Sequence, residues 1–340
     1  MSVIKGYQIQ SILAKGGMAT VYIAMQESLK RQVALKILDP KLDMTLLEHF
    51  LDESRIIASL KHPNIIPVFD VGRVGIHFYH AMEYLEGGDL ETRIAQGIDK
   101  HTVLEIILEL SDALHLVHSK GIIHGDIKPA NIVFRSDDCP VITDFGISKR
   151  IELAYSSSET SKDDSPANIL ASPSYASPEL MQNQSFNHKV DIYSLGVMMY
   201  EMLVGSKPYN GASPAELVAN SIQQPIPLFP DNLKSLQPLL DHMLAKDPDE
   251  RIGDARMISR YIKKYLRDHP NTSETKNQQN SDIDNNANGD VVLEYVSDSS
   301  SNSSSSTSLP ETISSSKMLL PLLVVLFSVI VALSVWHFVI

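Results

Sequence analysis

One stretch of the sequence, His124 to Gly146, constrains the fold and the chemistry of this chain more than any other. It reads HGDIKPANIVFRSDDCPVITDFG and contains two short apolar runs separated by turn-forming residues. Apolar, β-branched runs on either side of such a turn predict a β-hairpin. The hairpin would bring Asp144, which follows its second strand, back beside Asn131, which precedes its first.

The polar residues at the open end of this hairpin indicate a site for a metal ion and a phosphate. Asp126, Lys128 and Asn131 lie in one short loop, and Asp144 would return next to them. Carboxylate and amide oxygens are suitable ligands for Mg²⁺, and an ammonium group neutralises the charge of a transferring phosphoryl group. A hairpin with a purely structural role would not require Asn131 or Lys128.

The same stretch resembles the catalytic and metal-binding loops of eukaryotic-type protein kinases. The resemblance extends from about Tyr7 to about Leu266. It is greatest to bacterial membrane-anchored serine/threonine kinases, on the segments GGMATVY, HPNII, MEYLEGGDL and DIYSLGVMMYEMLVG. It implies an α+β, bilobal protein-kinase fold with a small, mainly β N-lobe and a larger, mainly α C-lobe. The implied cofactors are ATP and Mg²⁺, and the implied partners are proteins with serine or threonine acceptors.

The resemblance also implies a role for each polar residue of the hairpin. Asp126 would orient the substrate hydroxyl and accept its proton, and Lys128 would reach the γ-phosphate. Asn131 and Asp144 would hold magnesium. Ser172 replaces the threonine at the end of the family's activation segment, and it keeps the hydroxyl that would bridge Asp126 and Lys128.

A strand, turn and strand near the N-terminus are similar to the phosphate-binding loop of the family, although the pattern is degraded. Gly16 matches a glycine of G-x-G-x-x-G, whereas Ala14 and Ala19 replace the first and third glycines. Because backbone N–H groups of a glycine-bearing turn approach phosphates closely, we expect this loop to contact ATP. The implied nucleotide contacts in this region are Leu13, Ala14, Lys15, Gly16, Gly17 and Val21.

The apolar segment 33–38 predicts a strand in which Lys36 is the only charged residue. By resemblance, Lys36 would bind the α- and β-phosphates and pair with Glu53 of the following helix. Glu48 and Asp52 are competing carboxylates on that helix. A solvated helix charge is the plain alternative for Glu53.

Further implied nucleotide contacts lie where a buried strand ends. Met82 would be the gatekeeper beside the adenine, and backbone groups of Glu83 and Leu85 would bond its edge. Asp89 has two interpretations of equal weight, since it would accept from the ribose or cap the helix that begins at Leu90. The remaining implied contacts are Ala34 and Val133.

Three features of the second half agree with the same family. Glu179, in the segment SPE, would pair with Arg251 inside the C-lobe. Asp191, at the start of an apolar helix, would anchor the backbone of the catalytic loop. Four residues would stack as a hydrophobic spine between the lobes: His124, Phe145, Ile57 and Phe69.

Gly125 departs from the family, which has an arginine between the histidine and the aspartate of its catalytic loop. That arginine pairs with a phosphate on the activation segment, so loop phosphorylation is a less expected switch here. Two functions remain open: an active serine/threonine kinase, or a pseudokinase that binds nucleotide or partner proteins at the membrane. Gly125, Ala14 and Ala19 favour the second slightly. The first is favoured because every residue of the expected chemistry is present: Lys36, Glu53, Asp126, Lys128, Asn131 and Asp144. A small-molecule kinase is a third alternative, but it would lack the segment 177–179 that shapes a peptide groove.

Composition divides the chain into three parts. Residues 1–268 form the expected kinase domain, with an N-lobe at about 1–83 and a C-lobe at about 89–268. Residues 269–317 are rich in Ser and Asn and predict a disordered linker. Residues 318–340 carry no Asp, Glu, Lys or Arg and reach the roughly 20 apolar residues that span a bilayer. With no signal peptide at the N-terminus, we expect a tail anchor in the cytoplasmic membrane and a kinase domain in the cytoplasm.

Charge and cysteine content narrow the partners further. The net charge of −12 argues against nucleic acid, because a phosphate backbone demands clustered cations. The sole cysteine, Cys139, suits a reducing cytosol. His115 and His118 stand three apart on a predicted helix without a completing ligand set, so we interpret them as ordinary helix residues. The lipid bilayer and a second copy of the chain, for autophosphorylation, complete the expected partners.

Overall fold

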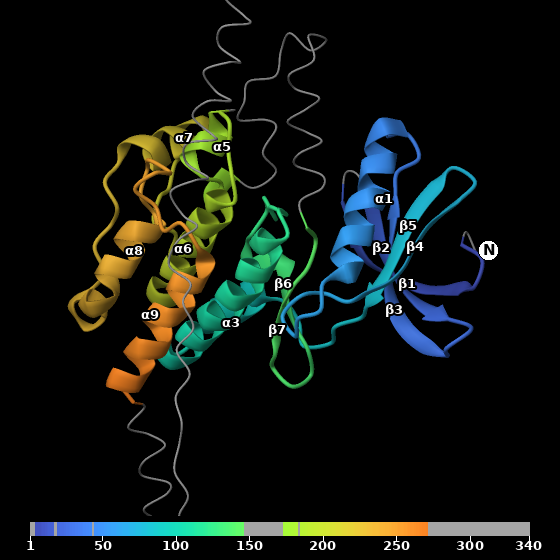
Figure 1. The fold of residues 1–340 in the computed structure, drawn as a ribbon, viewed down its shortest axis with the longest axis horizontal. Coiled ribbons are helices and arrows are strands. Elements are labelled where there is room, and N and C mark those ends of the chain that lie inside the picture. The colour runs from blue at the N-terminus through green and yellow to red at the C-terminus, as the bar shows by residue number, and fades with distance from the viewer. Residues whose placement is uncertain (1–3, 17–18, 43, 146–172, 183, 271–340) are drawn as a thin grey trace, which may run out of the picture. The chain divides into compact units, whose positions relative to one another are not determined.

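The computed structural model describes residues 4–16, 19–42, 44–145, 173–182 and 184–270, all of which belong to one compact unit. Within it, a sheet precedes a mainly helical part, as Figure 1 shows in the change from blue to orange. This arrangement confirms the predicted two-lobed α+β architecture.

The N-lobe is built on a five-stranded antiparallel sheet with the strand order β1-β2-β3-β5-β4. Its inner strands carry apolar and β-branched side chains, which fit a pleated and half-buried surface. In the register of β3 and β5, Lys36 lies opposite His80. The N-lobe elements are β1 (Tyr7–Lys15), β2 (Ala19–Gln26), β3 (Arg31–Leu38), α1 (Met44–Ser59), β4 (Val68–Val74) and β5 (His77–Glu83).

The C-lobe is organised around α6, which is buried on nearly every side. Such a helix belongs in the middle of a fold, and α6 contacts both α3 and α8. The amphipathic helix α9 packs against α3. The C-lobe helices are α2 (Leu90–Gln96), α3 (Lys100–Ser119), α5 (Pro178–Met181), α6 (Lys189–Val204), α7 (Pro214–Gln223), α8 (Gln237–Met243) and α9 (Ala255–Asp268), with 3₁₀ turns at Pro129–Asn131, Pro173–Tyr175 and Asp231–Leu236.

The predicted hairpin is present as β6 (Ile132–Phe134) and β7 (Pro140–Ile142). Val133 pairs with Val141 in the middle of its ladder. The hairpin is also joined to the segment before β4, because the Ile66 N–H donates to the Ile142 carbonyl at 3.0 Å. The residues on either side of the hairpin are therefore held by both lobes.

The predicted hydrophobic spine is correct at three positions and wrong at the fourth. The rings of His124 and Phe145 lie 4.7 Å apart, and Ile57 is buried. Phe69, however, is 37% exposed and stacks under the guanidinium of Arg31 at 3.5 Å. Val68 packs into the core instead and lines the same cavity as Phe145. A one-residue error in a strand moves a side chain to the opposite face.

The described part of the chain contains no helix with the length and apolar content that a membrane crossing requires. The segment 318–340, for which a membrane helix is predicted, lies outside the described residues, and so does the linker from 271 onward.

Candidate active site

The catalytic loop is closed by bonds around Asp126. Asn131, which is buried, donates from Nδ2 to the backbone carbonyl of Asp126 at 2.8 Å and to its Oδ2 at 3.0 Å. Lys128 Nζ lies 2.8 Å from the same Oδ2. The predicted trio of carboxylate, ammonium and amide is thus brought together within one loop.

The two ends of the hairpin meet as the sequence predicts. The Thr143 N–H donates to the Asn131 carbonyl at 2.9 Å, and its hydroxyl donates to the same oxygen at 3.1 Å. Asp144, the next residue, therefore follows directly on a residue bonded to Asn131. Its backbone has a φ of +49°, which is an uncommon conformation for a residue with a side chain.

Asp144 also reaches the N-lobe through Lys36. Lys36 Nζ lies 2.6 Å from Asp144 Oδ1. The Lys36 charge holds the pKa of Asp144 below its ordinary value, against the opposing effect of burial. The expected partner of Lys36 on α1, Glu53, has a side chain outside what the structure describes, so that pair stays a prediction.

His80 lies behind this ion pair, on the neighbouring strand. It is buried, its Nδ1 is 3.3 Å from the Ser54 hydroxyl, and its ring is 5.0 Å from that of Phe50. Burial, and then the charge of Lys36, lower the pKa of His80 to about 3. The imidazole is therefore neutral at ordinary pH.

Asp191 fixes the backbone of the catalytic loop, which confirms the predicted anchor. Its Oδ2 accepts from the His124 N–H at 2.9 Å, and its Oδ1 accepts from the Gly125 N–H at 2.7 Å. His118 donates to the same carboxylate at 2.8 Å. Burial opposes the charge on Asp191, but the bond and charge of His118 keep its pKa below the ordinary value.

Gly125 suits this anchor because of its backbone angle. Its φ is +75°, in the left-handed region where a side chain is strained. His124 is held beside it, since its Nε2 donates to the Thr143 carbonyl at 2.9 Å and its Nδ1 accepts from the Asp126 N–H at 3.2 Å. Burial lowers the pKa of His124, which agrees with a neutral ring.

A cavity of about 270 Å³ lies next to these groups and reaches Asp144. Its wall is mostly apolar, as expected of a small-molecule site. Lys15, Gly16 and Lys36 are absent from its lining, and Gly17 lies outside the described residues. The predicted contacts that line it are Leu13, Ala14, Val21, Ala34, Met82, Glu83, Leu85, Asp89 and Val133, and the lining residues that sequence reasoning missed are Ile66, Tyr84, Gly88, Ala130 and Thr143.

Asp89 caps α2, so the helix-cap interpretation is confirmed. Its Oδ1 accepts from the Thr92 N–H at 2.8 Å. The residue also lines the cavity. The ribose contact remains a prediction.

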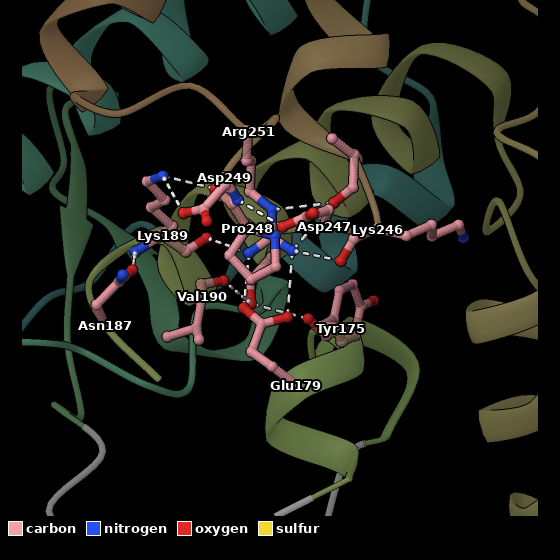
Figure 2. A network of polar contacts seen from close by, with 12 residues as sticks. Tyr175, Glu179, Asn187, Lys189, Val190, Lys246, Asp247, Pro248, Asp249 and Arg251 are labelled. Atoms are coloured by element: carbon pink, nitrogen blue, oxygen red, sulfur yellow. Dashed lines mark hydrogen bonds and ion pairs between the residues drawn. The ribbon is translucent and has the colours of Figure 1, made fainter. Parts of the chain in front are cut away.

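The end of the predicted activation segment is held by a buried ion pair, shown in Figure 2. Arg251 donates to Glu179 at 2.7 Å from one guanidinium nitrogen and at 3.2 Å from another. The Arg251 side chain is 0% exposed and that of Glu179 is 4% exposed. This confirms the predicted pair, whereas Ser172 lies outside the described residues.

His115 and His118 have defined partners that their spacing did not reveal. His115 Nδ1 lies 2.7 Å from Asp254 Oδ1, and His118 bonds Asp191. Both partners are distant in the chain, so no local pattern pointed to them. In the described ranges no cluster of three or more His, Cys, Asp or Glu residues forms a metal site.

Two carboxylates, an amide and two ammonium groups are connected by bonds around the hairpin, and one of the carboxylates, Asp144, lines the apolar cavity. Such a set can bind a polyphosphate and move a phosphoryl group to an acceptor held beside Asp126. The sequence comparisons agree with this geometry: a family model for the protein kinase domain matches residues 7–265. The chain therefore belongs to the protein kinase family.

Several bacterial kinases are similar to this chain. It is 33% identical over 267 residues to the serine/threonine-protein kinase PknJ of Mycobacterium tuberculosis, which is 75% of this chain and 44% of PknJ. It is 32% identical over 285 residues to a probable serine/threonine-protein kinase of Clostridium perfringens, with 81% and 40% covered. It is 31% identical over 257 residues to PknL of M. tuberculosis, with 73% and 63% covered. The chain thus spans less than two thirds of the length of these curated relatives.

Proposed function

We propose that this protein transfers the γ-phosphoryl group of ATP to serine and threonine hydroxyls of other proteins. The observation that carries the proposal is a set of bonded polar groups that reaches the apolar cavity at Asp144. Asp126 bonds Lys128 and Asn131, Asn131 is bonded to Thr143, and Asp144 bonds Lys36. The names of the similar kinases support the choice of serine and threonine. Lys128 supports it too, because by resemblance tyrosine kinases usually lack a lysine at this position.

Asp126 is the proposed base. Its carboxylate would accept the proton of the substrate hydroxyl as the hydroxyl oxygen bonds to the γ-phosphorus and the bond to the ADP oxygen breaks. Lys128, 2.8 Å from this carboxylate, would follow the phosphoryl charge as it moves to the acceptor. Asn131 orients Asp126 through its side-chain N–H, which fixes the carboxylate toward the acceptor.

Asn131 and Asp144 fit a divalent cation. They offer an amide oxygen and a carboxylate, which are hard oxygen ligands, and the Thr143 bonds hold the two residues together. Mg²⁺ bound there would neutralise the phosphate charge during transfer. Lys36 would contribute a further cation next to Asp144, which it bonds and which lines the cavity.

A nucleotide-binding pseudokinase is the second candidate. Ala14 and Ala19 replace two glycines of the phosphate loop, and Gly125 carries no charge. These changes weaken phosphate contacts and loop ordering, but they leave Asp126 and Asp144 in place. The two candidates therefore differ in phosphoryl transfer and agree in nucleotide binding.

The deciding experiment measures both properties on the full-length protein in detergent. The protein is incubated with labelled ATP, Mg²⁺ and a generic basic protein, and transfer to serine and threonine is scored by phosphoamino-acid analysis. A Mg²⁺-dependent rise in melting temperature with ATP is measured in parallel. Transfer supports the kinase, and a thermal shift without transfer supports the pseudokinase. If the protein shows no transfer and no thermal shift, both candidates are contradicted.

We also propose that residues 318–340 anchor the protein in the cytoplasmic membrane with the kinase domain in the cytoplasm. The support is the length and apolar content of this segment. Deleting it should move the protein from the membrane to the soluble fraction and preserve activity. Retention of the truncated protein on membranes at high salt would contradict this anchor.

A further inference from the structure

The segment between the two lobes, Glu83 to Asp89, is bonded directly to β6. The Gly87 N–H donates to the Phe134 carbonyl at 2.9 Å, and the Phe134 N–H donates to the Gly88 carbonyl at 2.9 Å. Asp89 and Val133 form an isolated β-bridge one step further. The interlobe segment therefore lies against the hairpin as a short additional strand.

This contact leaves no room for a side chain at Gly87. A Cβ placed there would lie 2.5 Å from the Arg135 carbonyl and 2.7 Å from the Phe134 carbonyl. The backbone of Gly87 thus lies directly against the backbone of Phe134 and Arg135. Main-chain contacts therefore hold the C-lobe end of the interlobe segment.

The near end of the segment is fixed by a side chain, that of Arg135. Its Nε and Nη2 lie 3.1 Å and 2.8 Å from the two carboxylate oxygens of Glu83, and its Nη1 donates to the Pro63 carbonyl. The side chains are 21% and 30% exposed. Two-pronged pairing of an arginine with a carboxylate fixes orientation as well as distance.

Both ends of the expected nucleotide thus depend on one hairpin. Glu83 lines the cavity, and its backbone is the expected contact of the adenine edge. Asn131 and Asp144, at the open end of the hairpin, belong to the phosphate end. A rigid hairpin that grips Glu83 keeps the two ends at a constant separation.

We propose that Arg135 is a positioning residue for nucleotide binding, which acts by holding Glu83 against the hairpin through its two-pronged bond. The inference rests on the proposed function, because it assigns the cavity to ATP. It goes beyond that function by naming a residue outside the cavity lining that sets nucleotide affinity.

An ordinary surface ion pair would not have this effect. Exposed pairs typically contribute about 0–1 kcal/mol and act on stability alone. The Lys263–Asp112 pair, at 2.9 Å and with the Lys263 side chain 56% exposed, supplies a matched control of that kind. It lies between α9 and α3, away from the cavity lining.

The test measures KM for ATP, KM for the protein substrate, kcat and the dissociation constant of a fluorescent ATP analogue in the full-length protein. Arg135→Ala should raise KM for ATP and the analogue's dissociation constant about tenfold, the size expected for a lost charged hydrogen bond. The protein-substrate KM and kcat should stay within about twofold. Lys263→Ala should leave all four unchanged.

Two further variants isolate the bond itself. Glu83→Gln removes the carboxylate and should weaken ATP binding as Arg135→Ala does, and the double variant should be no worse than either, because both changes break one interaction. Arg135→Lys keeps the charge without the two-pronged geometry and should fall between wild type and Arg135→Ala.

The outcomes separate this inference from the function on which it rests. If the wild type does not bind the analogue, the proposed function and the inference both fail. If the wild type binds it and Arg135→Ala binds it equally well, the inference alone is overturned. Should Arg135→Ala be unfolded by melting, Arg135→Lys and Glu83→Gln decide, and wild-type affinity in both overturns the positioning role.

Discussion

Two ion pairs that join distant parts of the chain differ in how completely their charges are satisfied. In the C-lobe, every guanidinium nitrogen of Arg251 bonds an oxygen: those of Glu179 and the carbonyls of Ala245, Lys246 and Lys189. Between the lobes, Lys36 and Asp144 have side chains 15% and 36% exposed, and Asp144 lines the cavity of about 270 Å³. The first pair is closed, and the second is open toward a ligand.

The difference shows what each pair contributes. A closed, fully bonded pair holds the end of the activation segment in the C-lobe but offers nothing to a substrate. An open pair has unused bonding capacity, which Mg²⁺ and phosphate would use. Removing one partner of the closed pair leaves a buried, unpaired charge, which lowers the free energy of unfolding. A change at the open pair or at the catalytic residues next to it should mainly lower the rate of phosphoryl transfer.

The largest effect is expected on the side of the open pair, from the substitution Asp126→Asn in the catalytic loop. Without a proton acceptor the transfer rate should fall by about 10²–10⁴-fold, while ATP binding stays nearly intact. The measurement is initial rate together with the nucleotide-induced melting shift. A variant that retains more than about a tenth of wild-type activity would show that Asp126 is not the base.

In the closed pair, Arg251→Ala should lower the free energy of unfolding by about 3–5 kcal/mol, because Glu179 is left buried and unpaired. Chemical denaturation measures this, with Lys263→Ala as the control for an exposed pair. Replacing both Arg251 and Glu179 by leucine should recover part of the loss. A loss under about 1 kcal/mol would mean that the pair is not satisfied as described.

A smaller effect concerns His80, behind the open pair. Its pKa is about 3 in the folded protein and 6.5 in the reference state, so the unfolded chain binds more protons below pH 6.5. Stability is complete above that pH and falls as the pH decreases. Between about pH 7 and about pH 5 the wild type should lose about 2 kcal/mol more than His80→Phe. Equal losses in both proteins would contradict a neutral, buried His80.

The smallest effect is expected from the loop that precedes the closed pair. Because Gly125 offers no charge to a phosphate, replacing Ser156, Ser157, Ser158, Thr160, Ser161 and Ser165 together by alanine should change turnover by less than about threefold. Initial rates of the dephosphorylated wild type and the variant are compared. Low activity in both, restored in the wild type by autophosphorylation, would show that phosphorylation of this segment switches the kinase despite Gly125.

The sequence predicted the parts of this molecule that local motifs specify. The hairpin follows from its two apolar runs and the turn between them. The pair Glu179–Arg251 and the anchor Asp191 were implied by the resemblance of their segments to the protein kinase family. These predictions needed only the order of the elements, not their exact packing.

Contacts set by packing were missed or mistaken. Phe69 was predicted in the spine where Val68 packs instead, because strand register cannot be read from two adjacent apolar residues. Arg135 and Glu83 lie 52 positions apart, and no motif connects them. His118 reaches Asp191 only after α3 and α6 pack together. Such pairs become visible only when the fold brings their elements together.

The position of the sole cysteine has a practical consequence. Cys139 Sγ lies 3.6 Å from Arg135 Nη1 and 3.4 Å from Asn64 Nδ2, in the hairpin that grips the interlobe segment. Burial raises the pKa of this thiol, so its reaction with a maleimide should be slow. Because the chain has no other cysteine, a single dye can be attached there without removing competing thiols, and its emission should respond to changes around Arg135 when nucleotide binds.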